Sequence, residues 1–272
     1  MASVAGISTD AGRGAGSSLT DFVDRWIFVF TAAFFIVTVL VGFVPDSIAK
    51  VAAVEAGRRP PFPVVLHVHA VLMGTWLTLL LTQTILMATG RRKWHMQLGV
   101  VSLVLAPAMV VTGLVLVPTM YGMLWPVVQA APPQAKPAME LALRNANNIA
   151  LLQIRVGVLF PLFIGMALAA RRKDPQFHKR LIILATSMPL GAAVQRMTWL
   201  PSSLPESGLS PVLLGLIPVV PMFVWDVYRL GRVPRAYTVW FAICAPTVVV
   251  GELLWDSKWW LATVPKMMGV AG

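Results

Sequence analysis

Long apolar runs separated by short polar segments dominate the chain. Seven such runs, each of roughly 20 residues, occur at 23–44, 63–88, 95–118, 148–170, 179–200, 210–230 and 236–255. An α-helix of about 20 residues crosses the hydrocarbon core of a bilayer. Because backbone polar groups in lipid must bond within the structure, helices are the expected form of these runs. The pattern predicts an all-α polytopic membrane bundle of about seven transmembrane helices.

The polar segments divide the chain into three parts. Residues 1–22 are small, polar and rich in Gly and Ser, which predicts a flexible cytoplasmic tail. The seven-helix membrane domain covers 23–256, and its hairpins 63–118 and 148–200 predict a four-helix core. The Trp-rich segment 257–272 is typical of an interfacial tail. In the long connection 119–147, the stretch PAMELALRNANN favours a short amphipathic helix on the membrane surface.

Composition narrows the class of protein. Apolar residues make up 57% of the chain, charged residues 12%, and the mean hydropathy is +0.76, values that exclude a soluble domain of this length. The net charge of +11 comes from basic residues clustered in short loops. In such loops Lys and Arg set topology and meet anionic lipid headgroups, so the lipid bilayer, and not nucleic acid, is the expected partner.

Three basic loops alternate along the chain with loops that carry fewer Lys and Arg residues. They read RRKWH, RRKDPQFHKR and RLGRVPR and follow the second, fourth and sixth apolar runs. Cytoplasmic loops carry an excess of Lys and Arg. This alternation predicts a protein of the bacterial inner (cytoplasmic) membrane with its N-terminus in the cytoplasm and its C-terminus outside.

Two of the four histidines, His95 and His178, each follow an Arg-rich turn at the start of an apolar run. Ionisable residues inside a membrane are costly and usually functional. Imidazoles from two helices can hold a b-type haem, with basic residues near its propionates. The pair predicts a redox centre, haem b first and copper second, and its expected basic neighbours are Arg91, Arg92, Arg171 and Arg172. The alternative is that both are interfacial histidines in contact with water and lipid phosphate.

The other two histidines, His67 and His69, open the second run. Residues i and i+2 of a regular helix point in nearly opposite directions, so the pair could bind one ion only if the proline-rich entry is irregular. His69 and Met73 share one face, and a nitrogen–sulfur pair suits copper or a haem iron. All three residues are therefore candidate metal ligands.

Charged and amide side chains within the apolar runs predict a polar cluster near the outer face. A buried arginine needs a carboxylate, a carbonyl or an anionic ligand, and Glu252 is the only acidic residue predicted at similar depth. The cluster is either a structural network or an outward-facing pocket for a quinone headgroup or an anionic substrate. Its predicted members are Arg155, Arg196, Gln153, Gln195 and Glu252.

Several other chemistries have no support in the sequence. The chain has no Walker loop, GxSxG, HExxH or carboxylate pair. Its only cysteine, Cys244, lies within an apolar run, which excludes a disulfide framework and a CxxCH haem attachment.

The stretch LHVHAVLMGTWLTLLLTQTILMATGRRKWHMQLGVVSLVLAPAMVVTGL, followed by AARRKDPQFHKRLIILATSMPLGAAVQR, resembles a group of uncharacterised bacterial multi-span membrane proteins. More distantly, it is similar to b-type transmembrane cytochromes with two haems. The second resemblance implies His95 and His178 as haem ligands on one side and His67 or His69 on the other, where no partner histidine from another helix is evident.

Together these observations favour a membrane protein that binds a redox centre and passes electrons or supports a respiratory or oxidase-type complex. A quinone or another membrane subunit is the expected partner. Two alternatives stay open: a cofactor-free protein, either a small-solute carrier or an accessory subunit, and a membrane enzyme with an outward-facing histidine pocket.

Overall fold

The computed structural model describes residues 11–270, in which all regular secondary structure is helical. Six helical segments of this range are long and apolar enough to cross a membrane: Ser18–Glu55, Val64–Ala88, Arg92–Gln129, Lys136–Ala170, Leu209–Leu230 and Arg235–Leu254. The predicted all-α membrane bundle is confirmed. The predicted run at 179–200 forms shorter helices, none of spanning length on its own.

The helices follow one another with short connections. Their bounds are α1 (Ala11–Glu55), α2 (Val64–Ala88), α3 (Arg92–Gly99), α4 (Ser102–Gln129), α5 (Lys136–Ala170), α6 (Pro175–Ser187), η1 (Met188–Leu190), α7 (Gly191–Val194), α8 (Leu209–Leu214), η2 (Ile217–Val219), α9 (Val220–Leu230), α10 (Arg235–Leu254) and α11 (Lys258–Met267).

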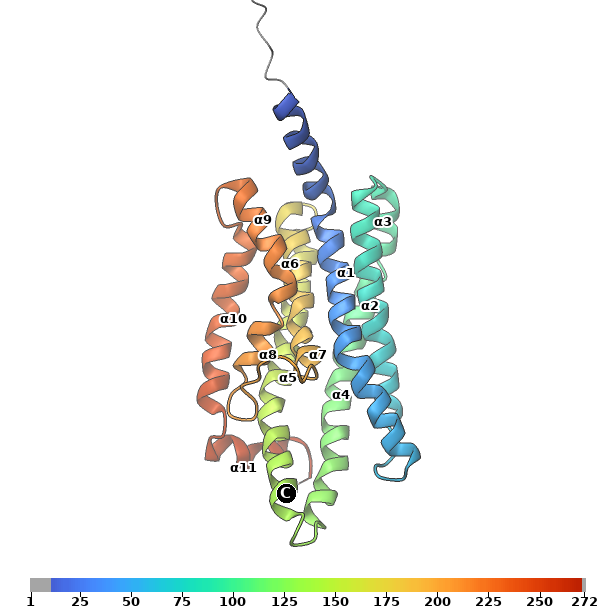
Figure 1. Ribbon diagram of the computed structural model, residues 1–272, viewed down its shortest axis with the longest axis vertical. Coiled ribbons are helices and arrows are strands. Elements are labelled where there is room, and N and C mark those ends of the chain that lie inside the picture. The colour runs from blue at the N-terminus through green and yellow to red at the C-terminus, as the bar shows by residue number, and fades with distance from the viewer. Residues whose placement is uncertain (1–10, 271–272) are drawn as a thin grey trace, which may run out of the picture.

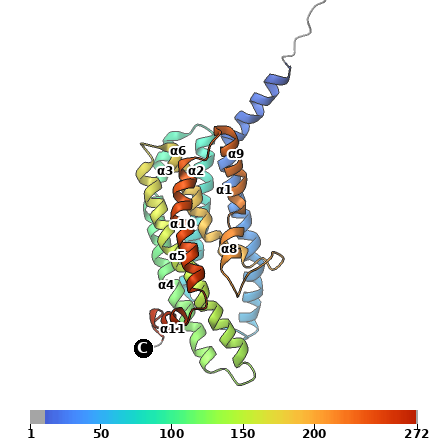
Figure 2. The same ribbon diagram turned by 90° about the vertical axis from the view of Figure 1, so that its left-hand side faces the viewer.

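The long helices run side by side along one axis (Figures 1 and 2). Helix α4 packs between α2 and α5, α5 also packs against α6, and α1 covers α2. Trp76 of α2 closes this core: its indole N–H donates to Thr186 of α6 over 3.1 Å, and its ring meets Phe160 of α5 edge to face at 5.4 Å. The buried core also includes Phe35 of α1, Met222 of α9 and Trp240 of α10, so it extends beyond the four helices of the two predicted hairpins.

The three basic loops gather at one end of the bundle. The turns α2–α3, α5–α6 and α9–α10 all lie at the top of Figure 1, whereas the turns α1–α2 and α4–α5 and the short helix α11 lie at the bottom. We call these the basic end and the far end. The helix starts that carry His95 and His178 are therefore both at the basic end.

Helices extend beyond their apolar runs at several points. Residues 1–10 of the predicted flexible tail lie outside the described range, but α1 begins at Ala11 and continues through Pro45 to Glu55. The stretch PAMELALRNANN is not a separate surface helix, because it forms the first turns of α5. Helices gain most of their stability from tertiary packing, so they continue past the segment that hydropathy marks.

The run at 179–200 ends early, at Val194, where the chain turns back into α8. Pro189 lies in the η1 turn, and proline cannot donate a helical hydrogen bond. Gly191 then lets the two backbones meet, since a Cβ there would lie 2.7 Å from the Pro211 carbonyl oxygen. The loop 195–208 between α7 and α8 lies beside the lower half of the bundle in Figure 1.

Candidate functional site

His178 stands in the first turn of α6. The carboxylate of Asp174 accepts a 2.9 Å hydrogen bond from the Phe177 N–H and caps the helix, with Pro175 at the first helical position. The half-buried His178 ring places Nδ1 2.8 Å from the Ala167 carbonyl oxygen of α5. Because a carbonyl only accepts, Nδ1 carries the proton and Nε2 keeps its lone pair. Metal-ligating histidines are held in this way.

His95 stands on α3 and is half-buried against α2. Its Nδ1 is buried and has no hydrogen-bond partner within residues 11–270, and Gln83 of α2 is one of its polar neighbours. The ring also lies within electrostatic range of His178. Both predicted ligands thus stand at the basic end, His178 with Nδ1 directed at a main-chain carbonyl and His95 with Nδ1 buried and unpartnered.

Gln83 is a third polar residue beside this pair and is absent from the predicted site. Its Oε1 is buried and, like His95 Nδ1, has no partner among the described residues. Its amide fits against α3 because Gly99 has no side chain: a Cβ there would lie 3.4 Å from Gln83 Nε2. A single amide within an otherwise apolar stretch is the sequence signal that could have identified it.

The four predicted basic neighbours differ in their surroundings. Arg92 lies close enough to His95, and Arg171 to His178, for their charges to act on the rings. Arg171 also donates to the Leu168 carbonyl over 2.6 Å, and Arg172 is exposed. Arg91 lines a surface groove of about 260 Å³, whose other lining residues are Thr82, Leu86, Trp94 and Leu98.

The predicted ligands near the far end do not form one site. Thr112 Oγ1 lies 3.0 Å from His69 Nδ1 and donates to the Ala108 carbonyl, so it accepts the histidine proton. His67 is exposed and contacts the Phe62 ring, whereas Met73 packs against the apolar core. Within the described range, no three His, Cys, Asp or Glu side chains form a metal-binding group.

The predicted polar cluster is divided among separate partners. Arg196 forms an ion pair with Asp46 of α1 (Nε to Oδ2, 3.1 Å) and stacks over Phe43. Because α1 continues past Pro45, Asp46 lies on the same helix and pairs with Arg196. The carboxylate partner of Arg196 is therefore Asp46 and not Glu252. Of the two amides, Gln153 is exposed and Gln195 is half-buried at the end of α7.

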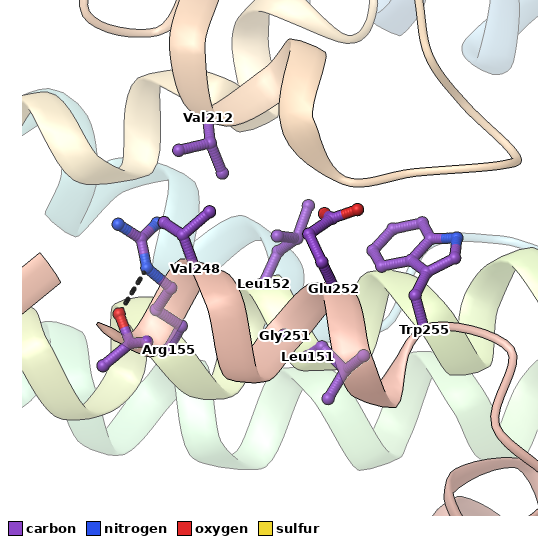
Figure 3. A pocket seen from close by; sticks show the side chains of 9 residues that line it. Leu151, Leu152, Arg155, Val212, Val248, Gly251, Glu252 and Trp255 are labelled. Atoms are coloured by element: carbon purple, nitrogen blue, oxygen red, sulfur yellow. Dashed lines mark hydrogen bonds between the residues drawn. The ribbon is translucent and has the colours of Figure 1, made fainter. Parts of the chain in front are cut away.

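Arg155 and Glu252 line one small cavity between α5, α8 and α10 (Figure 3). Arg155 Nε donates to Thr247 Oγ1 over 2.9 Å, and the Glu252 carboxylate accepts from Ser207 Oγ and the Gly208 N–H. Both extend to the same side, with apolar side chains between them. The cavity measures about 20 Å³, room for one water molecule. A quinone headgroup does not fit into this space.

A buried ion pair lies beside the site at the basic end. Two guanidinium nitrogens of Arg180 donate to the Asp226 carboxylate over 2.8 and 2.5 Å, and the side chains are only 6% exposed. The Tyr237 hydroxyl donates to the same carboxylate over 2.6 Å, and Gln176 accepts from Arg180. Every charge of this group is matched, and we assign it a structural role.

Amide and charged side chains also form a network at the far end, where α5 meets α11 and the turn before it. Asn148 donates to the Asp256 carboxylate over 2.7 Å and accepts from the Asp256 N–H, and Arg144 donates to both carboxylate oxygens. Asn147 accepts from the Tyr121 hydroxyl and, through its main chain, from the Trp260 indole. This far-end network attaches α11 to the bundle.

Comparisons with known proteins add no identification: no family model matches the chain, and neither a curated protein nor a solved structure shows significant similarity to it. The resemblance to uncharacterised bacterial membrane proteins and to b-type cytochromes therefore stays a prediction.

Proposed function

We propose that this chain is a membrane redox protein in which His95 and His178 hold a haem b or a copper ion. One observation carries the proposal. Of the two half-buried rings, His178 directs Nδ1 to the Ala167 carbonyl, which leaves Nε2 with its lone pair, and His95 has its Nδ1 buried without a protein partner in the described range. Neutral, oriented imidazoles are what an iron or copper centre requires.

The surroundings fit a haem in two respects. The rings stand on different helices at the same end of the bundle, and cationic side chains, Arg92 and Arg171, lie next to them as the propionates would require. Neither of the two cavities described above is lined by either ring, and a copper ion needs far less room than a macrocycle.

Either centre would exchange one electron at a time. Such a centre at the basic end would pass electrons to a membrane-soluble quinone or to another membrane subunit, or support a respiratory or oxidase-type complex. The protein's own residues would orient the imidazoles and provide an apolar, positively charged environment, which tunes the reduction potential of the centre.

The proposal includes an orientation. The clustering of all three basic loops at one end supports a basic end in the cytoplasm, in a bacterial inner membrane, with α11 outside. A topology reporter fused after residue 175 should report the cytoplasm, and one fused after residue 205 should report the outside. The reverse pattern would place the histidine pair on the opposite side of the membrane.

A cofactor-free function is the main alternative, and one observation favours it. The charged pairs Arg180–Asp226 and Arg196–Asp46 hold neighbouring helices together, as they would in an accessory subunit or a small-solute carrier. The enzyme alternative has less support, because His67 is exposed and His69 is engaged by Thr112.

The deciding experiment is an absorption spectrum of the purified protein, oxidised and dithionite-reduced, together with metal analysis of the same sample. We expect either a low-spin haem b spectrum or about one copper per chain. His95→Ala and His178→Ala should each abolish it, whereas the matched control His67→Ala, an exposed histidine at the other end, should not. A protein with neither haem nor copper after expression with both supplied would support the cofactor-free alternative.

A further inference from the structure

Two buried polar atoms at the basic end lack a hydrogen-bond partner. They are His95 Nδ1 and Gln83 Oε1, both unpartnered in the described range, and at the same end His178 Nε2 keeps a lone pair because Nδ1 serves the Ala167 carbonyl. A buried polar atom without a partner costs about 1 to 3 kcal/mol. The tautomer of His95 with the proton on Nε2 makes all three atoms lone-pair donors, and a bound cation would satisfy them together.

Position links Gln83 to the histidines. It is a polar neighbour of the His95 ring, and its side-chain amide lies against Gly99, one helical turn after His95 on α3. His178 is the electrostatic neighbour of His95 from the opposite helix. The amide oxygen and the two imidazoles thus stand on three different helices, α2, α3 and α6, at the basic end of the bundle.

We propose that Gln83 is a third ligand, and that with His95 and His178 it holds a single divalent metal ion. This inference rests on the proposed function and deepens it by naming the metal ion as the occupant. The ligand set is two imidazole nitrogens and one amide oxygen. For such nitrogen and oxygen sites copper binds most tightly among the divalent first-row metals.

A ligating amide oxygen would distinguish a metal ion from a haem as the occupant of this site. A haem supplies its own four equatorial nitrogens and takes two axial ligands, so it has no use for a third protein oxygen beside the imidazoles. A bare ion has no ligands of its own and takes every donor within reach. A neutral amide is a weak ligand, which predicts that Gln83→Glu, by adding a negative charge, strengthens binding.

The test uses the full-length protein in detergent, stripped with a chelator, with copper(II) alone as the probe. Copper affinity is measured by competition with a chelator of known strength, and the ligand set by electron paramagnetic resonance. We expect Gln83→Leu to weaken binding by about 10- to 100-fold and Gln83→Glu to restore or exceed wild-type affinity. Gln97→Leu, an exposed glutamine on α3, should bind copper as the wild type does.

Stability of the stripped protein gives a second readout. If Gln83 Oε1 serves only a ligand, Gln83→Leu removes an unpartnered acceptor and should leave the unfolding temperature unchanged or higher. A clear drop would show that the amide is structural and would overturn the proposal. If Gln83→Leu binds copper with wild-type affinity, or if it keeps an intact haem spectrum, Gln83 is not a metal ligand. Either result would overturn this proposal and leave the redox function in place. Failure of the wild type to bind either group would overturn the redox function itself.

Discussion

Two buried amides, one at each end of the bundle, differ in how they are bonded. At the far end, Asn148 is fully buried and its side-chain amide uses both its oxygen and its nitrogen on Asp256, which also binds Arg144. At the basic end, the amide of Gln83 has its oxygen buried without a partner, next to a histidine nitrogen in the same condition. The same functional group is thus fully bonded in one place and left open in the other.

Whether a buried polar group has a hydrogen-bond partner indicates its role better than its residue type does. Histidines and amides occur at both ends, but His69 is matched by Thr112 whereas His95 retains an unpartnered nitrogen. Buried polar groups are almost always bonded in folded proteins, so an exception calls for a specific explanation. Arg59 Nε, Asn145 Oδ1 and Trp240 Nε1 are also buried without a partner in the described range. Gln83 and His95 differ from them because a second imidazole with a free nitrogen, His178, stands at the same end.

The largest effect is expected at the buried ion pair of the basic end, which lies near the site but is fully matched. Asp226→Leu leaves Arg180 buried without its carboxylate, and should lower the free energy of unfolding by about 3 to 5 kcal/mol. The double variant Arg180→Met with Asp226→Leu should recover most of this loss, because neither charge remains. Thermal and denaturant unfolding in detergent measure both. Little destabilisation in the single variant would show that unmatched charges are tolerated at this end, and would weaken the comparison.

The next largest effect is expected at the far end. Asn148→Leu removes two hydrogen bonds, leaves the Asp256 N–H without a partner and leaves Arg144 as the remaining donor to the Asp256 carboxylate, so it should cost on the order of 2 to 3 kcal/mol. Gln83→Leu, the same chemical change at the basic end, should cost nothing in the metal-free protein. If the two variants unfold at the same temperature, the contrast between the ends is incorrect.

A smaller effect is expected where a histidine is already matched. Thr112→Val keeps the shape of the side chain but takes away the acceptor for the His69 proton, and should cost about 1 kcal/mol. The haem or copper content should be unchanged, because His69 is not assigned to the centre. A loss of cofactor in this variant would move part of the site to the α2–α4 interface.

The sequence predicts the helix ends at the three basic loops more accurately than the start of α1 or the far ends of α1, α4 and α5. Predicted starts and ends there differ by a few residues at most from those of α2, α6 and α10, because Arg-rich turns mark them. At the far end α1, α4 and α5 continue for several turns after the apolar run ends. No charge pattern marks those ends, since packing against neighbouring helices determines where they stop.

The same reason explains which site residues could be predicted. His95 and His178 are recognisable because a histidine after a basic turn at a helix start is unusual in an apolar chain. The partner of Arg196 was not predictable, because Asp46 follows a proline that suggests the end of the first helix. Gln83 stands out in the sequence only as a single amide within an apolar run, and the absence of a hydrogen-bond partner for its oxygen is visible only in the tertiary structure.

The smallest effect concerns acid stability at the far end. The Arg144 guanidinium, helped by Asn148, holds the pKa of the Asp256 carboxyl below its ordinary value, against the opposite effect of burial. A carboxyl whose pKa is lower in the folded state contributes stability above the unfolded pKa of about 4, and this contribution is lost as the pH falls through the folded value. Asp256→Asn cannot titrate, so the difference in unfolding temperature between wild type and variant should shrink between pH 6 and pH 3. Because the Arg144 side chain is 52% exposed, added salt should reduce this difference at pH 6. A difference that does not change with pH would mean that the amide of Asn148, and not the charge of Arg144, holds Asp256 in place.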